Sequence, residues 1–549
     1  MQKLLSCLAI ALLSGMAITA QGQSFSHADS LRGALRPERT CYDVRHYDLR
    51  MKVDPATQRI SGSNTIRFDL VTASPRLQID LFENMLIDGI TMEGQALTYK
   101  RDAGAVFVDL PAALSMGSHS MEVRYSGTPI AAARAPWDGG FVWKKDSQGK
   151  PWVGVACEGT GASLWWPNKD YLGDEPDSML ITVTAPIGLK TVANGNQRSV
   201  RDLDAQWTET TWAVTYPINN YNVTINIADY VQIHDTMRNA SGVHDLDYYV
   251  LRENEAKARK QFEQVKPMMR VYEKAWGEYP FWRDGFALVE THYLGMEHQG
   301  AIAYGNHYLP GYDGYDPLGL KFDYIVIHET GHEWWGNSVS CKDHAELWIH
   351  EGFCTYGEAV YVENLWDKET ATRYMLNQRS NIVNMDPIVG PLDVNFQGWS
   401  GSDMYYKGAW MLHTLRNQVN DDALWWKTLH DFAVAFRIKN TDTKEVIAWW
   451  NEHLGKDYTW LWREYLYHAK PPVFVYEAKA KGSKTQLKCR WEASEKDFKL
   501  QIPIVKPDGS RIMISPTTTL SKITVDVPAD QLKVDGTTWY GKMREGKKK

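Results

Sequence analysis

The sequence predicts a multidomain protein with an N-terminal antiparallel β domain, a central α+β domain and a small C-terminal β-sandwich. Apolar residues alternate from about Cys41 to Tyr230, take helical spacing from about Val250, and alternate again after Pro471-Pro472. With 549 residues the chain is long enough to form several hydrophobic cores. We therefore place the domains at residues 41–235, 236–470 and 471–549, preceded by an N-terminal extension at residues 23–40.

The first residues, 1–22, have the pattern of a secretory signal peptide. Lys3 precedes the apolar run Leu4 to Ile18, which is too short and wrongly flanked to span a membrane stably. No later segment reaches eighteen consecutive apolar residues, so we expect no membrane span. The mature protein is expected to be secreted or periplasmic.

Charge and cysteine content exclude other classes of function. The formal net charge of −7 argues against a nucleic-acid partner, and the only basic run is the tail at residues 547–549. Five cysteines follow the predicted signal peptide, an odd number at wide spacings, which indicates neither a disulfide framework nor a cysteine zinc cluster. They are Cys41, Cys157, Cys341, Cys354 and Cys489.

Strands and helices are predicted within each domain. Tyr47 to Val53 and Asn64 to Leu70 show the alternation of half-buried strands, and Asn222 to Tyr230 ends that pattern. Helical spacing appears from Val250 to Trp276 and from about Tyr405 to Val419, with a strand predicted between them at Phe286 to Glu290. After residue 471 the alternation at residues 498–505 and 522–527 predicts the final sandwich.

The stretch around His328 predicts a zinc site. His328 and His332 are four residues apart, so on a helix both imidazoles lie on one face and can bind the same ion. Glu329 is turned about 100° from His328 around that helix, which places it beside the metal, where it can take a proton from water. We expect a largely buried helix from Lys321 to Val339, because apolar residues recur there and no proline interrupts.

A catalytic zinc usually has three protein ligands and one open position for water. Glu351, eighteen residues beyond His332 on a second predicted helix, is the candidate third ligand. A bare H-E-x-x-H occurs by chance about once in a hundred chains of this length, so the third ligand strengthens the prediction. Glu358 lies two turns further on the same helical face, where a carboxylate can orient a ligand histidine, although the sequence favours a role outside the metal site. We expect His350 to be a packing or hydrogen-bonding residue and Glu333 to face solvent.

A family resemblance appears at these residues. His332 to Val339 together with Leu347 to Phe353 resembles the aminopeptidase N-like zinc peptidases, which carry H-E-x-x-H, eighteen residues and then Glu. Thermolysin-type endopeptidases space the glutamate one residue further. The resemblance implies a thermolysin-like α+β catalytic domain with one Zn²⁺ ion per chain.

Gly295-Met296-Glu297-His298 is similar to the G-x-M-E-N exopeptidase motif of that family. The resemblance implies that Glu297 binds the free α-amine of a peptide and that Gly295, Met296 and His298 help hold the substrate as an added strand. Only the first peptide bond would then reach the metal. His298 stands where the family has asparagine.

Two further stretches resemble the family. Cys157 to Pro176 looks like its glutamate-containing stretch before F-P-x-x-D-E-P, which implies that Glu158 is a second anchor for the amine. Extra residues, around Lys169 to Leu172, interrupt that stretch. Tyr405-Tyr406-Lys407-Gly408 resembles Y-x-K-G and implies that the Tyr405 hydroxyl stabilises the oxyanion, although packing is the simpler role for any one of 28 tyrosines.

The function implied by the resemblance is hydrolysis of the N-terminal peptide bond by a zinc-activated water, with Glu329 as general base. Alternatives are a zinc endopeptidase of thermolysin-like chemistry, an epoxide hydrolase, and a non-catalytic binding protein that retains the fold. Glu297 and the spacing to Glu351 disfavour the endopeptidase, and the intact ligand set disfavours the binding protein. Nothing in the sequence distinguishes epoxide hydrolysis from peptide hydrolysis.

Overall fold

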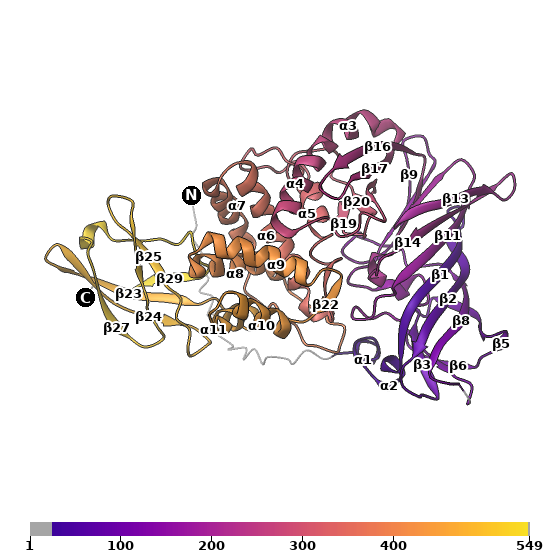
Figure 1. Cartoon of the computed structure of the whole chain (residues 1–549), viewed down its shortest axis with the longest axis horizontal. Coiled ribbons are helices and arrows are strands. Elements are labelled where there is room, and N and C mark those ends of the chain that lie inside the picture. The colour runs from indigo at the N-terminus through magenta and orange to yellow at the C-terminus, as the bar shows by residue number, and fades with distance from the viewer. Residues whose placement is uncertain (1–24, 113, 547–549) are drawn as a thin grey trace, which may run out of the picture.

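The computed structural model describes residues 25–112 and 114–546. A β-rich N-terminal part, a central helical part and a C-terminal β-sandwich follow one another along the long axis of the molecule (Figure 1). The predicted signal peptide and the basic tail lie outside the described residues. No helix among the described residues is long and apolar enough to cross a membrane.

Two short helices, α1 (His27–Gly33) and α2 (Pro37–Thr40), precede the first strand. Ser26 and Asp29 form a capping box at the start of α1, which satisfies backbone N–H groups that have no partner within the helix. Proline at the first position of α2 is favourable because its missing N–H is not needed there. The predicted extension is therefore an ordered part of the fold from residue 25 onward.

The N-terminal part contains three sheets. The largest has the order β13-β14-β11-β1-β2-β8-β4-β5, and smaller sheets have the orders β12-β15-β10-β9 and β3-β7-β6. Their strands are Tyr42–Asp54 (β1), Arg59–Leu70 (β2), Arg76–Asp80 (β3), Met85–Met92 (β4), Gln95–Ala96 (β5), Tyr99–Asp102 (β6), Ala105–Asp109 (β7), Gly117–Gly127 (β8), Gly140–Lys145 (β9), Pro151–Ala156 (β10), Ser178–Pro186 (β11), Lys190–Ala193 (β12), Asn196–Asp202 (β13), Trp207–Val214 (β14) and Ile225–Ala228 (β15).

Alternation along these strands buries one face, as the sequence predicts. In β2, Ile60, Ile66, Phe68 and Leu70 are buried together with Asn64, which lies on the same face, while the residues of the other face are more exposed. The sheet is antiparallel except that β1 pairs in parallel with β11, which returns to it after a long connection. The antiparallel description therefore holds for the sheet as a whole but not for this pair.

The central part begins with a five-stranded sheet of order β16-β17-β18-β20-β19. Its strands are Tyr230–Arg238 (β16), Val243–Leu251 (β17), Phe286–Glu290 (β18), Gly295–Met296 (β19) and Ile302–Tyr304 (β20). The expected division between residues 235 and 236 falls inside β16, which pairs with β17 along its whole length. The change of sheet therefore comes near Asp229, a few residues earlier than predicted.

Helices form most of the remaining central part; α3 and α5 contact the five-stranded sheet, and α8 to α11 lie between it and the C-terminal part (Figure 1). They are Glu255–Gln261 (α3), Val265–Trp276 (α4), Tyr324–Gly331 (α5), Trp348–Leu365 (α6), Lys368–Gln378 (α7), Asp403–Val419 (α8), Asp422–Ala435 (α9), Thr443–His453 (α10) and Thr459–Leu466 (α11). Two short strands, Val339–Cys341 (β21) and Lys439–Thr441 (β22), pair in parallel beside them.

The predicted helix from Lys321 to Val339 is wrong at both ends. Asp323 caps α5, because its carboxylate accepts from the N–H groups of Ile325 and Val326, so the helix begins at Tyr324. It ends at Gly331, after which the chain turns and pairs Trp335 with Val339. Apolar residues continue through this turn because it is buried, which is why periodicity alone extended the helix.

The C-terminal part consists of two facing sheets with the orders β27-β24-β23-β29 and β26-β25-β28. The strands are Val473–Lys481 (β23), Lys484–Glu492 (β24), Ile502–Val505 (β25), Arg511–Ile514 (β26), Ser521–Val525 (β27), Lys533–Val534 (β28) and Lys542–Glu545 (β29). Its core is continuous with that of the helices: Trp460 of α11 packs edge-on against Phe498, with ring centroids 5.2 Å apart.

Candidate zinc active site

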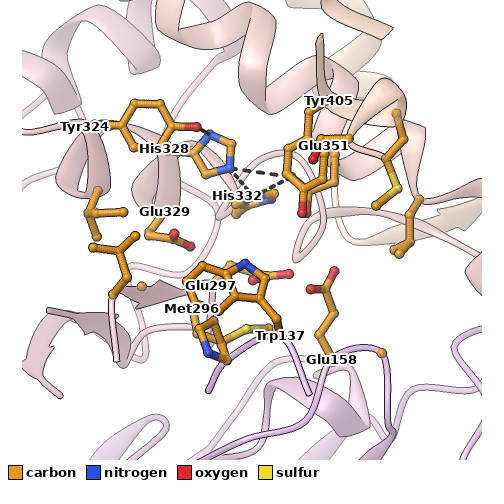
Figure 2. A pocket seen from close by; sticks show the side chains of 18 of the residues that line it. Trp137, Glu158, Met296, Glu297, Tyr324, His328, Glu329, His332, Glu351 and Tyr405 are labelled. Atoms are coloured by element: carbon orange, nitrogen blue, oxygen red, sulfur yellow. Dashed lines mark hydrogen bonds and ion pairs between the residues drawn. The ribbon is translucent and has the colours of Figure 1, made fainter. Parts of the chain in front are cut away.

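Three side-chain donors converge at the junction of α5 and α6 (Figure 2). His332 Nε2 lies 3.2 Å from His328 Nε2 and 3.3 Å from Glu351 Oε2, and His328 Nε2 lies 3.5 Å from Glu351 Oε2. All three residues are buried. The predicted ligands are therefore brought together by the fold.

Other groups hold the far nitrogen of each imidazole. His328 Nδ1 lies 2.7 Å from Glu358 Oε1, and that carboxylate also accepts from Tyr374 and Gln378. His332 Nδ1 lies 2.8 Å from the Trp335 carbonyl oxygen, so it donates to that oxygen. With both Nδ1 atoms engaged in this way, each Nε2 lone pair faces the common centre. Glu358 thus orients a candidate ligand, the role that the sequence favoured less.

These donors fit a zinc ion. Ligands about 2.0–2.1 Å from a tetrahedral ion lie about 3.3 Å from one another, which matches the observed separations. Glu351 Oε2 is buried and has no hydrogen-bond partner among the described residues, as expected for an atom that faces a metal. Two histidines and one glutamate are also the donor set of known hydrolytic zinc sites.

Cys354 is a neighbour that the sequence did not indicate. Its Sγ lies within 4.8 Å of ring nitrogens of His328 and His332. The thiol donates to the His328 carbonyl oxygen at 2.9 Å, so it supports the backbone of α5. All five cysteines among the described residues are buried and unpaired.

Glu329 lines the same pocket as the zinc donors. Burial raises the pKa of its carboxyl to about 7, while the neighbouring His328 and His332 oppose this rise. Space for the carboxylate comes from Gly295 on β19: a Cβ built there would lie 2.4 Å from Glu329 Oε1. Residue 295 must therefore be glycine if the Glu329 carboxylate, the predicted base, is to keep its position.

Tyr405 reaches the pocket from α8. Its ring stacks on the His328 ring with centroids 6.2 Å apart. Burial raises the pKa of its hydroxyl well above the usual value, and the Glu351 charge adds to the effect, so the phenol is neutral. Helices α6 and α8 meet at two glycines: a Cβ on Gly408 would lie 3.0 Å from the Gly352 Cα, so the backbones touch.

Two more carboxylates lie below the zinc donors (Figure 2). Glu297 has an oxygen within 4.8 Å of donor atoms of His332 and Glu351, and it accepts a hydrogen bond from Tyr221 at 3.0 Å. Glu158 lines the same pocket, and its Oε1 is buried without a partner among the described residues. Burial, and then the charge of Glu297, raise the pKa of Glu158. A cation placed between the Glu158 and Glu297 carboxylates would offset both the burial of the charge and the repulsion between the two groups.

His298 does not share this position. It is fully buried, it does not line the pocket, and neither ring nitrogen has a hydrogen-bond partner among the described residues. Burial lowers its pKa to about 3, so the ring is neutral. The His298 side chain therefore turns into the protein, while Gly295 and Met296 line the pocket, and the part of His298 in holding the substrate stays a prediction.

Glu333 and His350 complete the residues around the motif. The expectation that Glu333 faces solvent is wrong: it is fully buried and accepts from the Gly300 N–H at 2.8 Å and from the Tyr279 hydroxyl at 3.0 Å. His350 has the predicted hydrogen-bonding role, because its Nε2 accepts from the Cys341 N–H at 2.8 Å. Glu333 thus ties the turn after α5 to its surroundings, and His350 ties α6 to β21.

The pocket has a volume of about 350 Å³ and an aromatic mouth. Trp137, which is 69% exposed, lies near Met296 and Glu297 (Figure 2). Trp399 and Tyr312 also line the pocket. The sequence did not single out these aromatic residues, because the 23 tryptophans are spread along the chain and no spacing marks those at the site.

Comparison with known protein families gives two matches. A model described as the peptidase family M1 domain matches residues 260–465, and one described as the peptidase M1 N-terminal domain matches residues 44–221. Together they span well over half of the chain, including the residues of the pocket from Glu158 to Tyr405.

Curated relatives are distant. Glutamyl aminopeptidase of Sus scrofa is 24% identical over 318 residues, which are 51% of this chain and 33% of that protein. Aminopeptidase N of Lactobacillus helveticus is 23% identical over 417 residues, which are 70% of this chain and 46% of that protein. The chain thus spans less than half the length of these relatives.

Solved structures share the fold. An M1 zinc metallopeptidase from Deinococcus radiodurans superposes with a TM-score of 0.66 at 20% identity, over 78% of this chain and 94% of that one. A variant of an M1 zinc metallopeptidase from the same organism, bound to a Tyr-Ser-Ala substrate, gives a TM-score of 0.64 over 80% of this chain and 97% of that one. Zinc peptidases therefore adopt this arrangement of domains.

Proposed function

Because the chain belongs to peptidase family M1, we propose that it is a zinc aminopeptidase that removes single residues from the amino ends of peptides. One observation carries the proposal: the Glu297 and Glu158 carboxylates line the pocket that holds the zinc donors, and Glu297 lies within 4.8 Å of two of those donors. A substrate ammonium group bound by these carboxylates leaves the first peptide bond nearest the metal site.

The sheet edge supports the same orientation of the substrate. β19 is the last strand of the five-stranded sheet, and among the described strands it pairs only with β20. Gly295 and Met296 of β19 line the pocket. An extended peptide that adds to this edge gains backbone hydrogen bonds that do not depend on its sequence. Affinity from the backbone suits an enzyme that accepts many peptides.

His328, His332 and Glu351 would hold the zinc ion. When bound, zinc lowers the pKa of water towards about 7 and polarises a carbonyl group. The rest of the catalysis is assigned to side chains of this chain, each within the same pocket.

Glu329 is the proposed general base. A carboxylate with a pKa near 7 can take a proton from the attacking water at neutral pH and return it to the leaving amine. Tyr405 is the proposed oxyanion donor, because its hydroxyl stays protonated and can donate one hydrogen bond to the developing negative charge.

The names of the relatives support this reaction class. Those described above are an aminopeptidase N and a glutamyl aminopeptidase, and the structural neighbours include a zinc metallopeptidase with a peptide substrate bound. Free peptides with an unblocked amino end are therefore the proposed substrates. The N-terminal sequence, with Lys3 before the apolar run Leu4 to Ile18, supports action in a secreted or periplasmic location. Cell fractionation of the full-length protein tests that location.

The test of function is hydrolysis of aminoacyl chromogenic amides, each prepared with a free or an acetylated amine. We expect cleavage of the free-amine substrates only, loss of cleavage on chelation, and its return with added zinc. Glu297→Gln should raise KM for the free-amine substrates, since it removes a charge that binds the ammonium group. Cleavage of acetylated substrates at similar rates would instead assign an endopeptidase, and no cleavage by zinc-loaded protein would assign a binding protein.

A further inference from the structure

We propose that an ion pair between Arg32 of the N-terminal extension and Asp170 of the inserted loop positions Glu158 and thereby the amine-binding end of the pocket. Arg32 and Asp170 are here called the clasp. The inference rests on the proposed function, since it assigns a positioning role for binding of the substrate amine. It concerns two segments in which this chain departs from the family.

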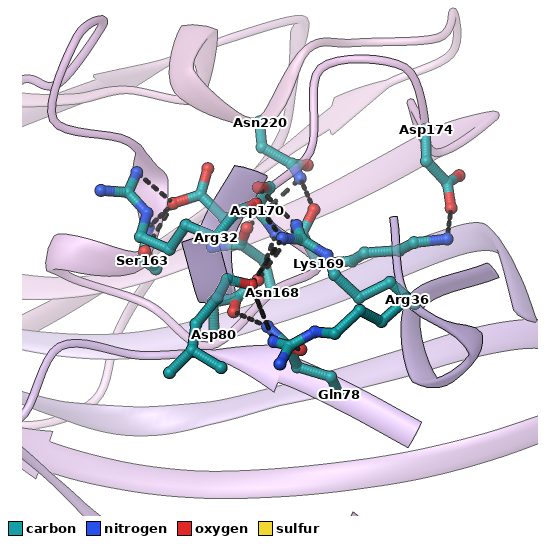
Figure 3. A network of polar contacts seen from close by, with 12 residues as sticks. Arg32, Arg36, Gln78, Asp80, Ser163, Asn168, Lys169, Asp170, Asp174 and Asn220 are labelled. Carbon is teal, nitrogen blue, oxygen red and sulfur yellow. Dashed lines mark hydrogen bonds and ion pairs between the residues drawn. The ribbon is translucent and has the colours of Figure 1, made fainter. Parts of the chain in front are cut away.

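The two departing segments lie against each other (Figure 3). The extension precedes residue 44, where the match to the M1 N-terminal domain begins, and Asp170 lies among the extra residues that interrupt the family's stretch after Glu158. Arg32 Nη2 donates to Asp170 Oδ2 at 3.2 Å, with the two side chains only 12% and 8% exposed. Arg39 Nη2 donates to the Asp170 carbonyl oxygen at 2.7 Å.

A buried carboxylate fastens this clasp to the β domain. Asp80, at the end of β3, accepts from the Asp170 N–H at 3.1 Å and pairs with Arg39 at 3.3 Å. The side chains of Arg39 and Asp80 are fully buried. A hydrogen-bonded pair in this setting holds its partners in one geometry, because breaking it would leave a charge buried and unpaired. Asp170 is therefore held in one position relative to the β domain.

In this position Asp170 holds the turn that carries Glu158. Its Oδ2 accepts from both the N–H and the hydroxyl of Ser163, and the Gly161 N–H closes the turn on the Cys157 carbonyl oxygen at 2.6 Å. Gly161 has φ +90°, and a Cβ there would lie 2.1 Å from Arg32 Nη2. The guanidinium group therefore packs directly on the backbone of the turn.

Helix α1, which carries Arg32, also contacts the opposite wall of the pocket. A Cβ on Gly33 would lie 2.4 Å from backbone nitrogens of Val394 and Asn395, so α1 contacts that loop backbone to backbone. Two residues further along, Gln397 lines the pocket. Gln397 also approaches the turn, since a Cβ on Gly159 would lie 3.3 Å from its Oε1. The extension thus supports both walls at this end.

Glu158 depends on this support. Its Oε1 has no hydrogen-bond partner among the described residues, so the placement of the carboxylate follows from the backbone of its turn. Loss of the clasp should let the turn move and weaken binding of the ammonium group. The zinc donors, Glu329 and Tyr405 lie in or directly after α5, α6 and α8, and among the described residues no hydrogen bond or ion pair joins the Arg32 or Asp170 side chain to these helices. KM should therefore change more than kcat.

The test compares Arg32→Gln, Arg32→Lys and a control, Arg76→Gln, on a free-amine aminoacyl amide. The control breaks an Arg76–Glu38 contact of 2.7 Å that joins the same extension to β3 without touching Asp170. We expect Arg32→Gln to raise KM about tenfold or more with kcat within about twofold, which corresponds to loss of a charge-assisted contact. Arg32→Lys should recover part of the loss, and the control should match the wild type.

Hydrogen exchange provides a readout that needs no activity. Exchange of the backbone amides at residues 157–163 should rise in Arg32→Gln and stay unchanged in Arg76→Gln. If the wild type cleaves no substrate, the proposed function fails while the exchange result still tests the clasp. If the wild type cleaves, the inference is overturned by an unchanged KM in Arg32→Gln, or by equal changes in Arg32→Gln and the control.

Discussion

Gly295 lies directly against the Glu329 carboxylate, so close that a Cβ on the glycine would be 2.4 Å from Oε1. The two residues come from different elements, β19 and α5, and their contact joins the proposed peptide-binding edge to the proposed base. Any side chain at residue 295 would have to displace that carboxylate or the Ile325 side chain, which is also within 2.9 Å. The proposed binding of the peptide backbone and the placement of the proposed base therefore both depend on the absence of a Cβ at residue 295.

Gly295→Ala should lower kcat by about 100-fold, because a displacement of the base by about 1 Å is enough for such a loss. The zinc content should stay at one ion per chain, since none of the three donors contacts residue 295 in the described structure. Steady-state kinetics and metal analysis of the purified variant check both. A variant with normal kcat would show that Glu329 has room to move without cost.

Glu329→Gln should abolish turnover while zinc remains bound, because the amide cannot accept the proton but fills the same space. Residual activity should be at least about 1,000-fold below the wild type, within the range attributed to general acid–base groups. Activity and metal content are measured on the same preparation. Retention of most activity would remove Glu329 from the role of base.

Glu358→Ala should weaken zinc affinity by about 10–100-fold, because the His328 imidazole loses the carboxylate that orients it. Tyr374→Phe removes only one hydrogen bond to Glu358 and should have a smaller effect. Competition with a chromophoric chelator gives both affinities. Equal affinities for Glu358→Ala and the wild type would mean that packing alone holds the imidazole.

The buried His413 should lower the free energy of unfolding in mild acid. Burial lowers its pKa to about 4, so the folded protein keeps it neutral, whereas the unfolded chain binds a proton below about pH 6.5. Its contribution to stability is therefore present above pH 6.5 and is lost as the pH falls towards 4. Thermal unfolding of wild type and His413→Gln at pH 7 and 5 measures this contribution.

The difference in stability between the two proteins should shift in favour of His413→Gln by about 1–2 kcal/mol at pH 5. Comparing the two proteins cancels the titration of all other groups, including the raised carboxyl of Glu175, whose pKa of about 8 acts in the opposite direction. An unchanged difference between the two pH values would mean that His413 titrates normally in the folded protein.

The sequence predicted the residues that depend on local spacing. His328, His332, Glu329 and Glu351 are placed by helical periodicity and by the length of the connection between two helices, and the structure brings all four into one pocket. The two flanking β parts follow in the same way from alternation. These features need little knowledge of how distant segments meet.

What the sequence could not predict depends on tertiary contacts. The turn after Gly331 is as apolar as a helix because it is buried on all sides, and Glu333 is buried because two donors from other segments, Gly300 and Tyr279, meet it. His298 turns inward although its neighbour Glu297 lines the pocket. The clasp was equally hidden, since it joins residues 138 positions apart.

The contact between Gly352 and Gly408 has a consequence for how this site can change. Glu351 precedes one glycine directly and Tyr405 lies three residues before the other, so the distance between the proposed metal ligand and the proposed oxyanion donor is set where two helix backbones touch. Most catalytic geometries can drift by exchange of one side chain for another of similar size. Here there is no side chain to exchange, and a methyl group at residue 352 or 408 would press on the facing backbone at 3.0–3.3 Å, so the helices would have to shift. The position of Tyr405 relative to Glu351 is therefore fixed by backbone contact and not by the choice of side chains.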